Sequence, residues 1–176
     1  MLIGSYSPSL VVISLFVAIL ASYTALDLAG RIATAKGRAM YLWIAGGAIA
    51  MGIGVWSMHF IGMLALRLPF ALGFDFGITA LSLLIAMFSS GFALWLISQP
   101  RLPAWQLMFG ALVMGAGIAA MHYTGMAAMR MTPGIDYDPT LFGASLLIAV
   151  AASGAALWIA YNLRRNAPYV RLMRGG

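Results

Sequence analysis

Residues 41–65 read YLWIAGGAIAMGIGVWSMHFIGMLA, an apolar run with one histidine and no Asp, Glu, Lys or Arg. About 20 helical residues cross the hydrocarbon core of a bilayer, so this run predicts a transmembrane helix. Similar runs precede and follow it, and the expected spans are 10–30, 41–65, 77–98, 105–128 and 141–162. The sequence therefore predicts an all-α membrane protein, a bundle of about five transmembrane helices that forms a single domain over residues 1–176.

Composition supports this class of protein. The chain is 63% hydrophobic and only 8% charged, whereas soluble domains carry about 25% charged residues. The net charge of +6 comes from basic residues that fall mostly between the apolar runs, where they determine topology. We therefore expect the lipid bilayer as surroundings and no nucleic-acid partner. The connectors are too short for a soluble catalytic domain, so we expect no enzymatic activity and no catalytic residue. The absence of cysteine excludes disulfides and thiolate metal sites.

The basic residues also predict an orientation, because cytoplasmic connectors are enriched in lysine and arginine. The connectors between the second and third runs and between the fourth and fifth runs contain few basic residues and three aspartates. Most basic residues lie on the opposite side: Arg31, Lys36, Arg38, Arg101, Arg164, Arg165, Arg171 and Arg174. We expect the N-terminus outside and the C-terminus in the cytoplasm.

The chain repeats itself with a period of 63 residues. The hexapeptide MHFIGM at 58–63 returns as MHYTGM at 121–126, and Gly52 upstream is matched by Gly115. The repeating unit is a pair of helices, so the two copies run in the same direction and their axis of symmetry lies near the membrane normal. The first helix of the chain resembles the second helix of this unit, without a first helix before it. His59 and His122 are then expected at one depth, near the outer ends of their helices, with converging side chains.

These are the only two histidines, and an ionisable side chain inside a membrane span indicates a functional site. Residues four apart share a helix face, so each histidine is expected to act with the methionine four residues later. Imidazole and thioether donors without carboxylate or thiolate favour copper, especially Cu(I). The candidate metal ligands are His59, Met63, His122, Met126, Met58 and Met121.

Several polar residues are expected around this site. Hydroxyl groups orient imidazoles by hydrogen bonds, and the candidates for that role are Tyr123, Tyr23, Ser57 and Thr124. At the inner end of the first helix, Asp27 is expected to pair with Arg31. At the outer ends, Arg67 and Arg130 are expected to anchor helices, and a repeated pairing with Asp75 and Asp138 is the alternative.

Three other functions remain open at this point. Two histidines at matched depth on facing helices are also a common way to bind haem. The repeated architecture is compatible with a transporter, although proline does not interrupt these spans. A purely structural membrane anchor is the third alternative.

The repeated hexapeptides resemble the MHYT domain of bacterial membrane signalling proteins, and the stretches 22–28, 56–65 and 117–121 strengthen the resemblance. The resemblance implies a multi-pass sensor domain in the inner membrane that binds copper through Met, His and Tyr residues. It also implies sensing of oxygen, carbon monoxide, nitric oxide or redox state. The implied partner is a cytoplasmic output module in cis or trans, either a diguanylate cyclase with a phosphodiesterase or a histidine kinase, and a homo-oligomer is a further expectation. The family has three motifs and typically seven helices, so we expect a chain truncated before the third motif, with Phe60 in place of a tyrosine.

Overall fold

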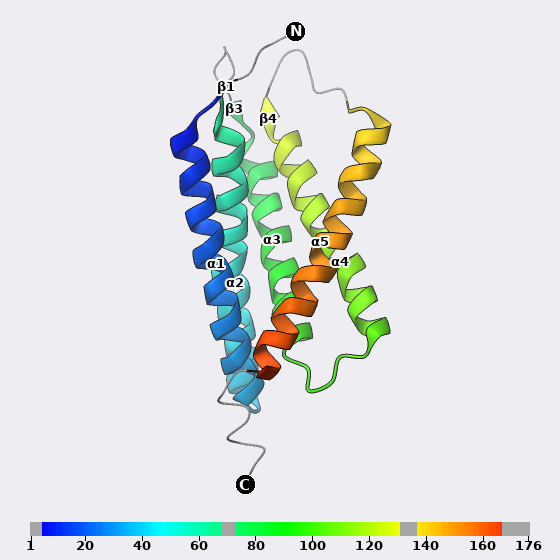
Figure 1. The fold of residues 1–176 in the computed structure, drawn as a ribbon. Helices are drawn as coiled ribbons and strands as arrows, with labels where there is room; N and C mark the ends of the chain where they lie inside the picture. Colours follow the sequence, from blue (N-terminus) through cyan, green and yellow to red (C-terminus); the bar gives the residue numbers. More distant parts are fainter. Residues whose placement is uncertain (1–4, 68–72, 131–136, 167–176) are drawn as a thin grey trace.

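The computed structural model describes residues 5–67, 73–130 and 137–166. Its five helices are α1 (Pro8–Thr34), α2 (Arg38–Leu64), α3 (Phe76–Ile97), α4 (Ala104–Ala127) and α5 (Pro139–Asn166). All five are long and apolar enough to cross a membrane, and each lies within a few residues of its expected span. Neighbouring helices are antiparallel, so α2 and α4 run in the same direction, as the repeat predicts (Figure 1).

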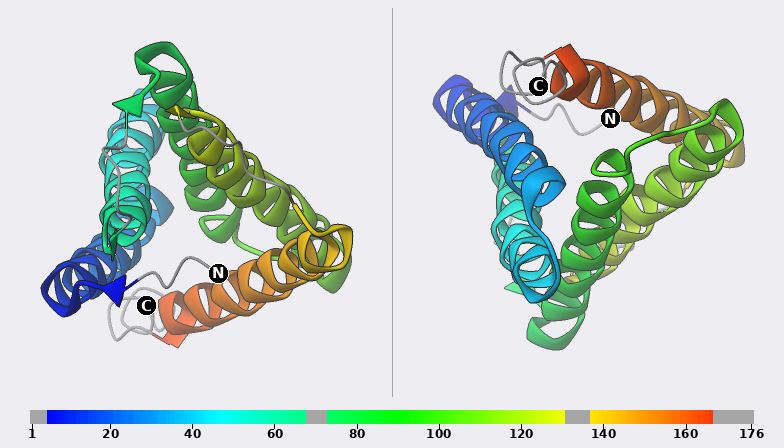
Figure 2. Two further views of the ribbon diagram at one scale, coloured as in Figure 1. Left: turned by 90° about the horizontal axis from the view of Figure 1, so that it is seen from above. Right: turned by 90° about the horizontal axis from the view of Figure 1, so that it is seen from below.

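Viewed along the helices, the bundle has a triangular outline (Figure 2). One side is formed by α1 with α2, the second by α3 with α4, and the third by α5 alone. The small buried core lies toward the end of the bundle away from the hexapeptides, with Ile32 and Leu94 as its most enclosed large side chains. Many large apolar side chains on the outer surface are exposed, which is the surface that a lipid environment covers.

Four strands of two residues each were not expected from the sequence. β1 (Ser5–Tyr6) pairs with β2 (Leu66–Arg67), and β3 (Gly73–Phe74) pairs with β4 (Met129–Arg130), both antiparallel. Pattern-based prediction needs runs of about four to eight residues to recognise a strand, so strands of two are too short to be detected. Each pairing joins the chain entering one helix to the chain leaving the next, and it closes the hairpins α1–α2 and α3–α4 at the same end of the bundle.

Two glycines at matching positions of the repeat pack against the following helix in the same way. A Cβ atom on Gly52 would lie 2.6 Å from the Cα atom of Met87, and one on Gly115 would lie 2.7 Å from the Cα atom of Val150. Met87 and Val150 are themselves 63 positions apart. Small residues allow this close approach of helix backbones in a membrane bundle. The α2–α3 and α4–α5 pairs therefore pack with the same register.

The ion pair beside the β3–β4 strands crosses between repeats. Arg130 donates to the Asp75 carboxylate at 2.7 Å, so the alternative pairing of Arg130 with Asp138 is wrong. The cause is the β3–β4 register, which places Arg130 opposite Gly73, two positions from Asp75. Asp138 instead accepts hydrogen bonds from the backbone of Leu141 and of its neighbour at the start of α5.

The other two predictions about charged side chains have different outcomes. The side chain of Arg67 lies outside the described residues, so its pairing stays a prediction. At the other end of the bundle, Arg31 donates to Asp27 at 2.7 Å, which confirms the expected pair. The Arg31 guanidinium also lies 5.2 Å from the centre of the Trp43 ring, a cation–π contact that links α1 to α2.

The substitution Gly52→Ala should destabilise the bundle, because the added methyl group would meet the backbone of α3. Overpacking of this kind costs about 1–3 kcal/mol. The control is Gly46→Ala, since nothing lies within 4 Å of a Cβ atom there. Thermal unfolding of the detergent-purified protein measures both variants, and equal midpoints would contradict the close α2–α3 contact.

The ion pair between Arg130 and Asp75 should make stability depend on pH. The hydrogen bond from Arg130 holds the pKa of the Asp75 carboxyl below its ordinary value of 3.8. A depressed folded-state pKa stabilises the protein above the unfolded-state pKa, and this contribution is lost as the pH falls through the folded-state pKa. Asp75→Asn, which retains a side-chain oxygen to cap α3, should therefore lower the unfolding midpoint at pH 7.

The difference between Asp75→Asn and wild type should shrink as the pH falls below 3.8. Arg130→Gln should lower the midpoint at pH 7 in the same way, because it removes the other partner. A midpoint difference for Asp75→Asn that is the same at neutral and acid pH would show that the ion pair does not contribute.

Candidate metal centre

The two histidine rings meet between α2 and α4. The ring centres of His59 and His122 are 4.8 Å apart, and the ring planes are inclined at 68°. His59 lies five residues before the last residue of α2, and His122 lies five residues before the last residue of α4. The predicted convergence of the two imidazoles at one depth is confirmed. It follows because α2 and α4, the motif helices that carry the two hexapeptides, run in the same direction and are related by the repeat.

One nitrogen of this pair has no partner. The Nε2 atom of His59 is buried and makes no hydrogen bond within the part of the chain that the structure describes. Gly125 on α4 leaves space beside it, because a Cβ atom there would lie 3.5 Å from Nε2. An unsatisfied buried polar group costs about 1–3 kcal/mol. A bound metal ion or hydrogen-bonding ligand would offset this cost.

Aromatic rings frame the pair in the same way in both repeats. His59 makes an edge contact with the neighbouring Phe60, and His122 makes one with Tyr123. The ring centres of Phe60 and Phe74 are 5.7 Å apart. In the second repeat, the ring centres of Tyr123 and Tyr137, the residue 63 positions after Phe74, are 5.5 Å apart. The aromatic contacts hold each motif helix against the chain that leads into α3 or α5.

Serines near the start of α3 and α5 hold the motif helices from the side. Trp56 donates through Nε1 to the Ser82 hydroxyl at 2.9 Å. The Tyr123 and Ser145 hydroxyls are 2.5 Å apart. Ser82 and Ser145 match in the repeat, so the sequence contained the signal for this pair of contacts, but their hydrogen-bonding role was missed.

A third serine acts on α2 from the opposite side. Ser14 on α1 donates to the backbone carbonyl of Met58, the residue before His59, at 2.9 Å. Ser14 precedes Ser82 by 68 positions, the same offset at which Ser22 matches Ser90. The helix that carries His59 is thus held by hydrogen bonds from both neighbouring helices.

The residues that were expected to orient the imidazoles do not all lie beside them. Tyr123 contacts His122 by its ring, while its hydroxyl is directed to Ser145. Tyr23 is 74% exposed, and it lies nine residues beyond Ser14 along α1, about 13 Å deeper. The structure therefore does not bring Tyr23 to the imidazoles. Ser57 and Thr124, the two other candidates, make no side-chain hydrogen bond within the described segments.

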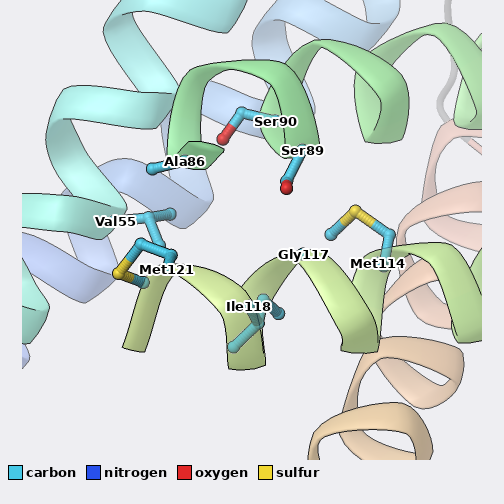
Figure 3. A pocket seen from close by; sticks show the side chains of 8 residues that line it. All are labelled: Val55, Ala86, Ser89, Ser90, Met114, Gly117, Ile118 and Met121. Carbon is cyan, nitrogen blue, oxygen red and sulfur yellow. The ribbon is translucent and has the colours of Figure 1, made fainter. Parts of the chain in front are cut away.

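The methionines give the pair its potential soft donors. Met63 and Met126 are partly buried and follow the two histidines by one helical turn. Met121 is almost fully buried and lines a cavity beside Val55 (Figure 3). No group of three or more His, Cys, Asp or Glu side chains occurs in the described ranges. A metal ion held by the two imidazoles would therefore have no carboxylate or thiolate ligand from these ranges.

Comparison with known families explains why the motif occurs twice. The model of the MHYT family, described as a bacterial signalling protein N-terminal repeat, matches residues 52–110 and again 115–172. The chain belongs to the MHYT family. The two matched segments begin 63 positions apart, which agrees with the period in the sequence and in the helix packing. With five apolar helices in this family, the chain is a multi-pass membrane protein.

Relatives of this MHYT chain include named signalling proteins. It is 63% identical, over its whole length, to the bifunctional diguanylate cyclase/cyclic di-GMP phosphodiesterase MucR of Pseudomonas aeruginosa, and it covers 26% of that protein. It is 45% identical to the cyclic di-GMP phosphodiesterase NbdA of the same species over 94% of the chain, which covers 21% of that relative. The signaling protein YkoW of Bacillus subtilis is 35% identical over 90% of the chain, which covers 20% of that protein. No solved structure matches the chain.

The contact between Tyr123 and Ser145 can be tested by a double-mutant cycle. Tyr123→Phe should lower the free energy of unfolding by about 1 kcal/mol, the usual contribution of a hydrogen bond. Ser145→Ala should lower it further, because the Ser145 hydroxyl also donates to the carbonyl of Phe142. The double variant should lose little more than Ser145→Ala alone, because that variant already removes the contact with Tyr123. Tyr137→Phe is the control. Fully additive losses would show that the two hydroxyls do not interact.

Proposed function

We propose that this chain is the sensory region of a bacterial membrane signalling protein and that it binds copper at the His59–His122 pair. The observation that carries the proposal is the direct contact of the two imidazoles, with a buried Nε2 atom on His59 that has no partner in the described chain. Two nitrogen donors that already lie together need little rearrangement to share one ion. This reduces the ordering cost of binding.

The donor set fits copper better than other metals. Zinc sites usually use cysteine, histidine or carboxylate ligands, and calcium and magnesium require oxygen ligands. The residues that would hold the ion are His59 and His122 together with Met63 and Met126, with Met58 and Met121 adjacent. Thioether and imidazole ligands favour copper in its reduced state. Bound copper would supply redox chemistry and an open coordination position for a small ligand.

A haem between the two histidines has less support. The rings contact each other directly, so a macrocycle between them would require α2 and α4 to separate. A single ion at the edges of the two rings requires no such separation.

The orientation proposed here places this site near the outer membrane surface. Arg31, Lys36 and Arg38 lie at the end of the bundle opposite the histidines, and basic residues are retained on the cytoplasmic side. The N-terminus would then be outside and the C-terminus inside, in the inner membrane. A site at the outer ends of α2 and α4 is accessible to gases and redox-active molecules from outside the cell.

The output is proposed from the named relatives. MucR is named as a diguanylate cyclase and cyclic di-GMP phosphodiesterase, and NbdA as a cyclic di-GMP phosphodiesterase. A cytoplasmic output module of this type is therefore proposed as the partner, in cis or in trans. The sensory chain itself performs no catalysis in this proposal. Oxygen, carbon monoxide, nitric oxide or a redox change would act by favouring one of two arrangements of the motif helices, since a ligand shifts an equilibrium only through its different affinities for the two states.

Copper content after purification tests the proposal. Protein expressed with copper and purified in detergent should retain stoichiometric copper by elemental analysis, and the His59→Ala/His122→Ala double variant should fall to background. Met63→Leu/Met126→Leu should weaken copper retention. Met108→Leu is the matched control, because Met108 is 70% exposed on α4, away from the motif. Equal copper in wild type and the histidine double variant would exclude the site.

A further inference from the structure

A small cavity lies one helical turn deeper than the histidine pair, between α2, α3 and α4 (Figure 3). Its volume is about 50 Å³. Val55 and Ile118 are on its wall, and each precedes a histidine by four residues, so each lies on the same helix face as that histidine. The cavity and the imidazole pair therefore share one seam between the helices.

Two hydroxyl groups from α3 face this cavity. Ser89 and Ser90 are among its lining residues, and Ser90 is only 8% exposed. Figure 3 shows the Ser89 hydroxyl directed toward α4 at Gly117. A Cβ atom on Gly117 would collide with that oxygen, so the glycine provides the space that the hydroxyl faces.

Ser89 and Ser90 differ from the serines that bond to a carbonyl group of their own helix. Ser22 donates to the carbonyl of Ala18 in its own helix, and Ser82 donates to the carbonyl of Thr79. Neither Ser89 nor Ser90 makes a hydrogen bond to any described residue. Leaving a hydroxyl unpaired in an apolar environment is unfavourable, so a partner inside the cavity would stabilise the structure.

We propose that the cavity is an internal hydration site in which ordered water is hydrogen-bonded by Ser89 and Ser90. One water molecule needs roughly 10–15 Å³ of such space and two or more polar partners, and the cavity provides both. A cavity of this size lined only by apolar groups would stay dry. The water lies one helical turn from His59 and His122, along the same seam between the helices.

The site is specific to one repeat. The position that matches Ser89 in the second repeat is Ala152, although Ser90 is matched by Ser153. Hydration is therefore proposed for the α2–α3–α4 interface only. It does not depend on copper, because neither serine is among the proposed metal ligands.

Radiolytic labelling can test this proposal, because the cavity is also lined by Met114 and Met121. A short X-ray pulse converts bound water into hydroxyl radicals, which oxidise adjacent methionines to the sulfoxide. The repeat supplies matched controls, since Met51 and Met58 occupy the equivalent positions of α2 and are not among the lining residues. The intact protein in lipid nanodiscs, in ¹⁸O-labelled water, should show faster labelling of Met114 and Met121 than of Met51 and Met58.

Two variants should remove this difference by independent means. Ser89→Ala/Ser90→Ala removes the hydrogen-bonding partners of the water, and Ala86→Leu fills the space. Each should reduce the labelling of Met114 and Met121 several-fold and leave the control methionines unchanged. Unfolding of a variant would instead raise labelling at all four methionines, and the other variant then decides.

The result that overturns the proposal can be seen in the wild-type protein alone. Labelling of Met114 and Met121 that is no faster than that of Met51 and Met58 would show that the cavity holds no water. The same comparison in the His59→Ala/His122→Ala variant separates the two proposals. Labelling that persists in this variant supports hydration independently of copper, and copper loss with unchanged labelling bears on the metal site alone.

Discussion

The close contacts of α2 with α3 at Gly52 and of α4 with α5 at Gly115 are the constraint on which the site depends. Each glycine lets its helix approach the neighbouring backbone, and this fixes the rotation of the helix about its own axis. His59 and His122 each follow their glycine by seven residues, or about two turns, so they project from nearly the same side as the contact. The packing that makes the repeat thus also sets the direction of both imidazoles.

Symmetry explains which parts of the site could be predicted from sequence. The number of helices, the period and the meeting of His59 with His122 follow from apolar runs and from one internal match. The strand pairing could not be predicted, because strands of two residues leave no periodic pattern. The pairing of Arg130 with Asp75 depends on that register and was therefore also missed. Methionine thioethers have three rotatable bonds, so helix spacing alone cannot place their sulfur atoms.

The two repeats hold their motif helices with different side chains. In the first repeat the hydrogen bond to the serine of the following helix comes from Trp56, and in the second it comes from Tyr123. Phe60 has no hydroxyl at the position of Tyr123, and Ala119 has no donor at the position of Trp56. Each repeat thus lacks one donor and retains the other. Phe60 cannot make the hydrogen bond that Tyr123 makes, but Trp56 makes it in the first repeat instead. The hydrogen bond to the serine of the following helix is therefore present in both repeats, although the residue that makes it differs.

The strand pairs and the buried core tie the helices together at opposite ends of the bundle. β1–β2 and β3–β4 lie next to the hexapeptides, but each acts within one hairpin, α1–α2 or α3–α4, and neither joins α2 to α4. The contact of His59 with His122 therefore depends on helix packing between the hairpins. At the other end, the buried core joins side chains of α1, α3 and α5. The end that carries Lys36, Arg38 and Arg101, which the orientation proposed here places at the cytoplasmic surface, is thus held by side-chain packing, because no strand occurs there among the described residues.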